Sequence, residues 1–303
     1  MPRLVYTEYK PKKRAKALIA LANKILSDFE CQGYKLTLRQ LYYQMVAQDV
    51  IKNSQASYKS LGGIISRARD SGMIDWNHIE DRTRRVRSFS HWNDKEDFMS
   101  SVVPQYRHDL WVGQSRRVMV FVEKEALEQV VGRAAQKWDV PYFANKGYLS
   151  SSAVWNVARN MMLLNEDKCR DWVILHLGDH DPSGIDMTRD IADRINQYSR
   201  IAPSDRKEGF EPVQIETRRI ALSMEQIEEY SPPPNPAKQT DARFEEYAAN
   251  YGTSSWELDA LRPQVITELI DSHIQKIVDE DKWEKRRKLM IKYRNQLLKQ
   301  SGL

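Results

Sequence analysis

Three carboxylates stand where this sequence could bind a divalent metal. Glu123 directly follows the apolar run VMVFV, and Asp179 and Asp181 follow the apolar run WVILHL. Two aspartates at positions i and i+2 of a turn can direct both side chains to one hard cation, and a glutamate from a neighbouring strand completes an oxygen site. Mg²⁺, with Mn²⁺ as an alternative ion, suits this set because it keeps waters and takes further ligands from substrate phosphates.

The aspartate pair also has two explanations without Mg²⁺. A Ca²⁺-binding EF-hand loop begins in the same way, but Asp190 stands where that loop needs a bidentate glutamate, and a strand instead of a helix precedes it. Alternatively, the carboxylates cap the N-terminus of the helix that follows, which needs no metal. His176 and His180 lie close by, and we interpret them as surface or hydrogen-bonding groups and not as ligands.

The elements around these carboxylates alternate between strands and helices. Apolar, β-branched runs predict strands at 118–122, 140–144, 172–177 and 213–222, with helices between them. This order is typical of a parallel α/β sheet, in which sites form beyond the carboxyl ends of the strands. We therefore predict a Rossmann-like domain over residues 114–303, with the three carboxylates at that edge.

Residues 257–299 predict further helical segments ending in the basic stretch KWEKRRKLMIKYR. Glu257 and Asp259 could extend the metal site or start a helix, and we favour the helix. No function is assigned to the segment 232–303.

The N-terminal part predicts three short helices. Apolar residues at helical spacing cover 14–30, Thr37 stands as N-cap before LRQLYYQMVAQ, and SYKSLGGIISRARDSG follows. With the hairpin-like stretch 72–89, this order predicts a winged helix-turn-helix domain over residues 1–113. The expected DNA-binding side chains are three cations facing outward on the third helix and four on the wing: Lys59, Arg67, Arg69, Arg82, Arg84, Arg85 and Arg87.

The two adjacent tyrosines of the second helix have different expected surroundings. Tyr42 falls in the apolar stripe with Leu41 and Met45, so we expect it in the core. Tyr43 lies about 100° further round and shares a face with Arg39 one turn earlier. A cation there could stabilise a phenolate and bind phosphate. The alternative is an ordinary tyrosine at the edge of the core of a DNA-binding helix.

Charge and cysteine content suggest an intracellular protein that binds polyanions. Of 303 residues, 47 are Lys or Arg and 42 are Asp or Glu; residues 1–117 carry a net charge of +9 and the remainder −4. A basic N-terminal part suits nucleic acid phosphates, although solvated surface charges would give the same imbalance. Only Cys31 and Cys169 are present, and no apolar run approaches the roughly 20 residues that cross a bilayer. We expect a cytoplasmic, nucleoid-associated protein without membrane contact.

Taken in order, VFVEKEA, NKGYLSSS and LGDHDPSGIDM resemble the Toprim domain of the topoisomerase VI A subunit and of the related meiotic double-strand-break protein. Upstream, TLRQLYYQ resembles the active-site helix of the winged-helix domain in that family. The resemblance covers roughly residues 36–230. It does not extend to the segment WELDALRP or the basic C-terminal stretch, and the chain lacks a G-x-x-x-x-G-K-[ST] loop for an ATPase of its own.

The resemblance implies DNA cleavage by tyrosine transesterification, with a 5′-phosphotyrosyl link and Mg²⁺ held by the Toprim acids. It implies Tyr43 as nucleophile, Arg39 as its basic helper, and the set Glu123, Asp179 and Asp181 for metal and acid–base chemistry. It further implies double-stranded DNA as substrate, a homodimer and a separate ATPase subunit. Two alternatives remain open: a Toprim nuclease that uses metal-activated water, and a non-catalytic winged-helix DNA-binding protein.

Overall fold

The computed structural model describes residues 3–80, 89–145, 147–163, 171–199 and 213–300. Within these ranges, four strands form one parallel sheet in the order β2-β1-β3-β4. They are β1 (Arg116–Val122), β2 (Tyr142–Ala144), β3 (Asp171–Leu177) and β4 (Ile215–Ala221). The predicted parallel α/β architecture is confirmed.

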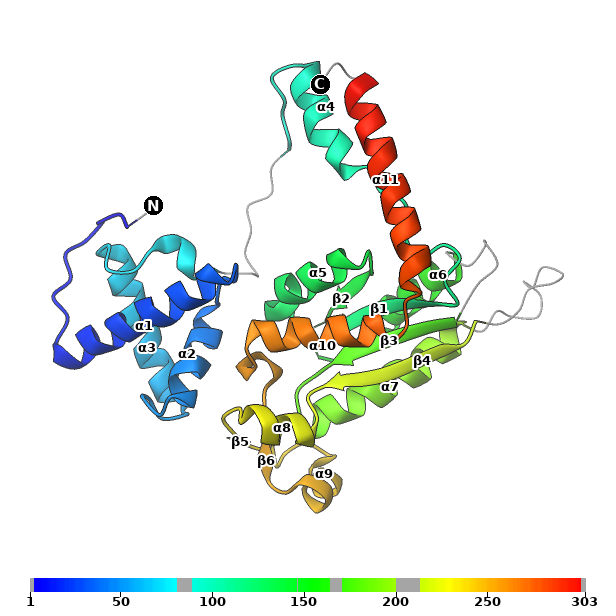
Figure 1. Cartoon of the computed structure of the whole chain (residues 1–303). Helices are drawn as coiled ribbons and strands as arrows, with labels where there is room; N and C mark the ends of the chain where they lie inside the picture. The colour runs from blue at the N-terminus through cyan, green and yellow to red at the C-terminus, as the bar shows by residue number, and fades with distance from the viewer. Residues whose placement is uncertain (1–2, 81–88, 146, 164–170, 200–212, 301–303) are drawn as a thin grey trace.

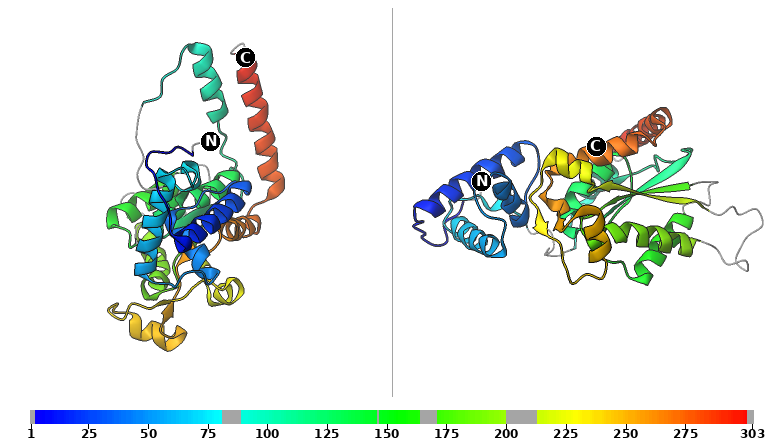
Figure 2. Two further views of the ribbon diagram at one scale, coloured as in Figure 1. Left: turned by 90° about the vertical axis from the view of Figure 1, so that its left-hand side faces the viewer. Right: turned by 90° about the horizontal axis from the view of Figure 1, so that it is seen from below.

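Helices cover both faces of this sheet (Figures 1 and 2). One face packs against α5 (Glu128–Lys137) and α10 (Pro263–Gln275), and the other against α6 (Ser151–Leu163) and α7 (Pro182–Ser199). Because successive side chains of a strand point to opposite faces, Val120 joins the first core and Phe121 the second. Burial on both faces explains why the strands are continuously apolar.

The chain reverses its direction across the sheet after β2. It passes through α5 to β2 on one side of β1, and then through α6 to β3 on the other side. The carboxyl ends of β1 and β3 are therefore neighbours at a topological switch point, where open α/β sheets place their crevice. Glu123 and Gly178 are the first residues after these two strands.

The three predicted N-terminal helices are confirmed as α1 (Lys13–Cys31), α2 (Leu38–Ala47) and α3 (Gln55–Asp70). Thr37 caps α2 as expected: its Oγ1 accepts from the Gln40 amide at 3.2 Å, and Gln40 Oε1 accepts from the Thr37 amide at 2.9 Å. The apolar faces of the helices form their own core, which includes Tyr42 and Tyr43.

The wing of the predicted winged helix is not confirmed. Of the expected hairpin 72–89, the described residues form a 3₁₀ turn, η1 (Trp76–His78), and a single bridge between Leu36 and Ile79, but no paired strands. Residues 81–88, which contain the four wing arginines Arg82, Arg84, Arg85 and Arg87, lie outside the described residues, as does Cys169.

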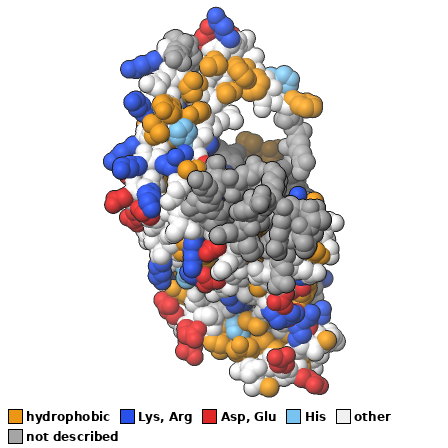
Figure 3. Space-filling view, turned by 90° about the vertical axis from the view of Figure 1, so that its right-hand side faces the viewer, with side chains coloured by type: hydrophobic (Ala, Val, Ile, Leu, Met, Phe, Trp, Pro, Cys, Tyr) orange, Lys and Arg blue, Asp and Glu red, His pale blue; other side chains and the backbone are white. Residues whose placement is uncertain are grey.

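Two helices project beyond the sheet: α4 (Lys95–Val102) and the C-terminal helix α11 (Glu280–Gln300) (Figures 1 and 2). Figure 3 shows Lys and Arg side chains along the outer edge of this projection. Trp111, just before the boundary predicted near residue 113, belongs to the core on the sheet, and the boundary itself stays a prediction. None of the helices in the described ranges is long and apolar enough to span a membrane.

Short elements surround the carboxyl edge of the sheet. They are η3 (Glu125–Leu127), α8 (Met224–Tyr230), β5 (Asn235–Pro236), α9 (Phe244–Tyr251), β6 (Ser254–Ser255) and η5 (Leu258–Ala260). The η5 turn packs against α2, and its Ala260 is buried in the core of the N-terminal helices. The segment around η5 thus joins the N-terminal helices to the sheet.

Candidate functional site at the carboxyl edge of the sheet

The structure brings Glu123 and Asp179 into direct contact. Glu123 Oε2 accepts a hydrogen bond from the Asp179 backbone amide at 2.9 Å. Gly178 makes this approach possible, because a Cβ atom at that position would lie 2.8 Å from Glu123 Oε2. Both carboxylates line one pocket of about 650 Å³, as Asp181 does.

Asp181 has a capping role at the start of α7. Its Oδ1 accepts from the Gly184 amide at 2.6 Å and from Ser183 Oγ at 3.0 Å. A Cβ at Gly184 would lie 2.3 Å from the Asp179 carbonyl oxygen, so the turn requires glycine there. The capping explanation left open by the sequence therefore holds for one oxygen of Asp181. Its second oxygen receives no hydrogen bond within the described ranges.

Arg219 of β4 holds the backbone of the turn between β3 and α7 in place. Its guanidinium donates to the carbonyl oxygens of Gly178 at 3.0 Å, Asp179 at 2.5 Å and Gly184 at 2.9 Å. These bonds satisfy carbonyls that the turn leaves without helical or strand partners. Three strands of the sheet thus position the aspartates. β1 does so through Glu123, β4 through Arg219, and β3 because the chain runs directly from it into the turn.

The pKa values show that negative charge accumulates at this edge. Burial and the neighbouring Asp179 raise the pKa of Glu123 to about 8. Burial also raises the pKa of Asp179 to about 6, and Lys124 only partly counteracts it. Carboxylates that resist ionisation together are what a cation would stabilise.

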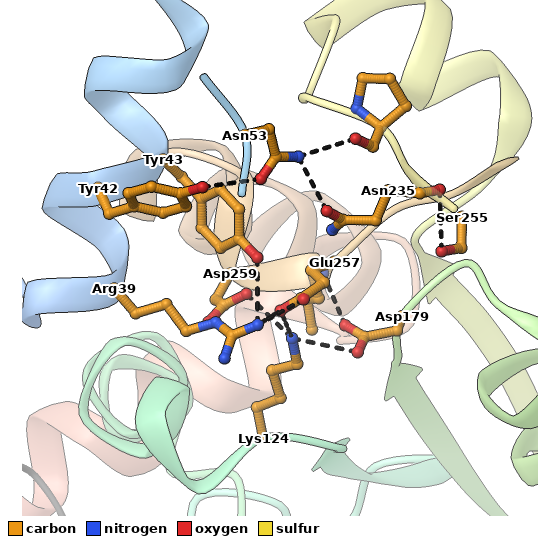
Figure 4. A network of polar contacts seen from close by, with 12 residues as sticks. Arg39, Tyr42, Tyr43, Asn53, Lys124, Asp179, Asn235, Ser255, Glu257 and Asp259 are labelled. Atoms are coloured by element: carbon orange, nitrogen blue, oxygen red, sulfur yellow. Dashed lines mark hydrogen bonds and ion pairs between the residues drawn. The ribbon is translucent and has the colours of Figure 1, made fainter. Parts of the chain in front are cut away.

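Lys124 places its ammonium group among three carboxylates. Nζ lies 2.8 Å from Glu257 Oε2, 2.9 Å from Asp259 Oδ1 and 3.1 Å from Asp179 Oδ2 (Figure 4). Burial lowers the pKa of Lys124, but the carboxylates, with Asp259 first, more than offset this, so the net pKa lies above its ordinary value. The ammonium group occupies the position of a cation between the sheet and the η5 segment.

Glu257 and Asp259 do stand at a helix start, since Glu257 precedes η5 and Asp259 lies within it, but this is not their only role. Glu257 makes no side-chain cap to η5, and Asp259 is only 2% exposed. Instead, both side chains face Lys124 and Arg39, while the adjacent Leu258 amide donates to Asp179 Oδ1 at 2.7 Å. Buried charges require partners, and these two acids pair with the two cations of the site.

Arg39 links the N-terminal helices to the acidic edge. Its Nη2 lies 2.5 Å from Glu257 Oε1, its Nε lies 3.6 Å from Asp259 Oδ2, and Nη2 also donates to the Tyr43 hydroxyl at 3.2 Å (Figure 4). The predicted pairing of Arg39 with Tyr43 on one helix face is confirmed. In this network the tyrosine, both cations and the acids of two distant segments meet within one chain.

Tyr43 is more buried than we expected. Its side chain is 3% exposed and lies in the helical core beside Tyr42, with ring centroids 5.3 Å apart. Burial raises the pKa of Tyr43, Glu257 and Asp259 raise it further, and the opposing effect of Arg39 is smaller. Arg39 lowers the pKa of Tyr43, as expected of a cation beside a phenolate, but burial first and then Glu257 and Asp259 outweigh this effect.

Tyr42 holds α2 to the following loop. Its hydroxyl accepts from the Ser54 amide at 2.7 Å and bonds Asn53 Oδ1 at 2.9 Å. Asn53 in turn donates to the Pro234 carbonyl and to Asn235 Oδ1, both at 2.8 Å (Figure 4). The prediction that Tyr42 is a core residue is confirmed, and its hydroxyl gives the helices a second attachment to the sheet side.

The two histidines are internal hydrogen-bonding groups, which is one of the roles expected for them. His176 Nδ1 lies 2.8 Å from Thr188 Oγ1, and His180 Nδ1 lies 2.8 Å from the Tyr247 hydroxyl. Burial and then Arg219 lower the pKa of His176 to about 3 and that of His180 to about 4. Both imidazoles are neutral near pH 7, and neither is at the surface.

The cations predicted on α3 behave differently from one another. Lys59 and Arg67 are exposed, although the Arg67 guanidinium lies over the Tyr9 ring at 5.2 Å. Arg69 instead donates to the carbonyl oxygens of Trp76 at 3.0 Å and Ile79 at 3.2 Å. Arg69 therefore does not point outward, because it satisfies the carbonyls of the turn that follows α3.

Carboxylate oxygens suit a hard divalent cation, but those of Glu123, Asp179 and Asp181 do not all converge on one point. In the described ranges, no three His, Cys, Asp or Glu side chains are arranged as a metal-binding group. Two observations explain this: one Asp181 oxygen caps α7, and Lys124 contacts Asp179. Glu123 and Asp181 each keep one oxygen for which these ranges contain no hydrogen-bond donor. Burial and the neighbouring Asp179 disfavour the ionised form of Glu123, and a cation bound there would stabilise that form.

Comparison with protein-family models and with curated proteins found no match to this chain. The fold and the site define an α/β protein with a parallel sheet whose switch point carries an acidic cluster joined to a helical N-terminal part. Lys124, Glu257 and Asp259 were not identified as site residues from the sequence. For Lys124 a signal existed, because it directly follows Glu123 at the strand end.

Proposed function

We propose that this protein is a Mg²⁺-dependent enzyme that cleaves DNA strands, with Tyr43 as nucleophile. The observation that carries the proposal is the continuous chain of contacts from the Tyr43 hydroxyl through Arg39 and Glu257 to Lys124 and Asp179. A phenol, two cations and metal-type carboxylates around one pocket are the groups that phosphoryl transfer requires.

Glu123, Asp179 and Asp181 would hold the metal. When bound there, Mg²⁺ supplies charge stabilisation for the phosphate oxygens. Arg39 and Lys124 would contact the same phosphate, since guanidinium and ammonium groups form charge-assisted hydrogen bonds to phosphate oxygens. For this they must exchange Glu257 and Asp259 for the substrate, because both cations are paired with these acids.

In the covalent step, the Tyr43 oxygen attacks the phosphorus while the bond to the 3′ oxygen breaks. The tyrosine loses its proton, the leaving 3′ oxygen gains one, and a 5′-phosphotyrosyl link remains. The raised pKa of Tyr43 means that the phenol is protonated before substrate binds.

The burial of Tyr43 favours a second candidate, a nuclease in which water attacks the phosphate at the same acidic cluster. The tyrosine is 3% exposed, so a phosphorus atom reaches its hydroxyl only from the side of Arg39 and Glu257. In this candidate Tyr43 positions Arg39 and forms no covalent bond. A third function, DNA binding without cleavage, would leave the acidic cluster with a structural role.

One experiment distinguishes these functions. Supercoiled plasmid is incubated with the protein and Mg²⁺ or Mn²⁺, and protein retained covalently on 5′ ends is measured. Our proposal predicts retention that is lost in Tyr43→Phe and in Asp179→Asn. Free 5′ phosphates with a Tyr43→Phe variant that still cleaves would support the nuclease, and a mobility shift without cleavage, unchanged in Asp179→Asn, would contradict both catalytic functions. Tyr42→Phe is the matched control because Tyr42 lies in the core one residue away.

The same experiment bears on the partners that the resemblance implies. Cutting both strands of double-stranded DNA takes two nucleophiles, so we propose a homodimer as the active form. Linear product in place of nicked product would support it. Strand passage would need ATP hydrolysis by a separate subunit, so the products formed by this chain alone should be the same with and without ATP.

A further inference from the structure

The C-terminal helix α11 carries a stripe of lysines that form no ion pair with any carboxylate among the described residues. Lys285, Lys288, Lys292 and Lys299 are all exposed, and from residue 285 to 300 the helix contains seven basic and no acidic side chains. At 100° per residue, the four lysines fall within about 60° of one another around the helix axis. They are separated by three, four and seven residues, which makes a stripe about 21 Å long.

The opposite side of α11 is fixed to the rest of the chain. Arg294 Nη2 donates to the Tyr106 carbonyl at 2.8 Å, Arg286 Nε donates to the Asp109 carbonyl at 2.7 Å, and Met290 is buried. The Tyr293 ring contacts His108 edge-on at 5.4 Å. Because these contacts set the rotation of the helix, the lysines face outward.

Other cations pair with two of the carboxylates near the start of the helix, while Glu280 and Asp281 of its first turn precede the stripe. Among the described residues, Lys282 pairs with Asp279 at 3.0 Å, and Arg287 pairs with Glu284 at 2.7 Å. Glu284 lies one turn before Lys288, but it is paired with Arg287. The four lysines repel one another, which destabilises an isolated helix slightly. A ligand with a regular row of negative charges would remove this repulsion.

The stripe lies far from the acidic cluster. Gln114, just before β1, donates to the Asp279 carbonyl at 2.9 Å, so α11 starts at the amino edge of the sheet, whereas Glu123 and Asp179 lie at the carboxyl edge. Figures 1 and 3 show α11 projecting from that end with Lys and Arg side chains along its outer edge. A polyanion on α11 would therefore bind at a place that the metal-type carboxylates do not reach.

We propose that the lysine stripe of α11 binds the phosphate backbone of a nucleic acid duplex, independently of the acidic cluster. A stripe of about 21 Å corresponds to about six phosphates of one strand at 3.4 Å per nucleotide. Lysine contacts of this kind are independent of base sequence. The proposed cleavage reaction also involves nucleic acid, but binding to the lysine stripe requires neither metal nor Tyr43.

The test measures binding of the full chain to a labelled 20-base-pair duplex by fluorescence anisotropy, in chelator and over a series of salt concentrations. Lys288→Gln/Lys292→Gln removes two stripe charges. Lys276→Gln/Lys282→Gln removes two charges outside the stripe, Lys282 being paired with Asp279. We expect the slope of log K against log salt to fall by about 1.8 in the stripe variant, at 0.9 per phosphate contact, and to stay unchanged in the control.

Two further measurements keep the outcome unambiguous. Lys288→Arg/Lys292→Arg should retain the wild-type slope, because it keeps the charges. Equal losses in the stripe and control variants, or no loss in either, would overturn the proposal. So would binding to vesicles with anionic lipid that depends on the stripe while duplex binding does not. Because chelator is present throughout, failure of strand cleavage leaves this result unaffected.

Discussion

The charged side chains at the two ends of the sheet differ in whether they are paired. At the carboxyl edge, Lys124 and Arg39 are surrounded by Glu257, Asp259 and Asp179, of which Asp259 and Asp179 are buried. On α11, beyond the amino edge, four lysines are exposed without a carboxylate partner among the described residues. Buried charges must be paired for the fold to be stable, whereas exposed charges need not be. At the carboxyl edge, the paired charges must therefore serve both the stability of the fold and the proposed chemistry. On α11, the exposed lysines are open to a partner.

The comparison predicts its largest effect at Lys124. Lys124→Met leaves three carboxylates without their shared cation, and loss of one partner of a buried ion pair costs about 3–5 kcal/mol. We expect the free energy of unfolding, measured in urea near neutral pH without divalent ions, to fall by about 3 kcal/mol or more. Millimolar Mg²⁺ should restore part of the loss.

Lys137→Met is the matched control for this change. Lys137 pairs with Asp271 at 2.6 Å, but its side chain is 57% exposed, so its removal should cost less than about 1 kcal/mol. Similar losses in the two variants would show that the carboxyl edge does not depend on its internal cation.

A smaller effect is expected when the acid that neutralises the cations is removed. Glu257→Gln frees Arg39 and leaves Lys124 with fewer negative neighbours, so both cations bind phosphate more readily. Affinity for a short DNA duplex should rise about tenfold, equivalent to about 1.4 kcal/mol. Glu216→Gln, which removes an exposed acid paired with Arg218, should leave affinity nearly unchanged. Weaker binding by Glu257→Gln would show that Glu257 does not compete with phosphate.

The pH dependence of stability gives a still smaller effect with a defined sign. Folding raises the pKa of Glu123 from 4.5 to about 8, so its contribution to stability is fully present below pH 4.5 and is lost as the pH rises to about 8. A divalent ion binds the ionised form. The increase in melting temperature caused by Mg²⁺ should therefore grow between about pH 6 and pH 8 and then level off. In Glu123→Gln this growth should disappear; an increase that is the same at every pH would contradict the assignment.

The sequence predicted the elements of the fold well and the site in part. Continuous apolar strands and the Thr37 cap have local signals, so the parallel sheet and α2 were predicted within a few residues. Tyr43 was placed beside Arg39 correctly, but its burial depends on how α1 and α3 pack around α2, which helix periodicity does not specify. The wing was predicted from a turn-rich, basic stretch, and the described residues show a 3₁₀ turn there.

The contribution of the η5 segment could not be predicted from local pattern. Glu257 and Asp259 are more than 200 residues from Arg39 in the chain, and an acidic pair before an apolar run equally indicates a helix start. Their role depends on a tertiary contact, the Leu258 amide bonding Asp179. Arg69 shows the same limit, since its carbonyl partners belong to a turn that carries no sequence signal for binding an arginine.

The most direct test of the account is a titration of the full chain with Mn²⁺, with free ion measured by electron paramagnetic resonance near pH 8. Wild-type protein should bind Mn²⁺ at a site that Mg²⁺ displaces and that is lost in Asp179→Asn and in Glu123→Gln, while Glu216→Gln keeps it. Failure of the wild-type protein to bind Mn²⁺, or unchanged binding in both acidic-cluster variants, would contradict the assignment of the carboxyl edge as a metal-dependent phosphoryl-transfer site.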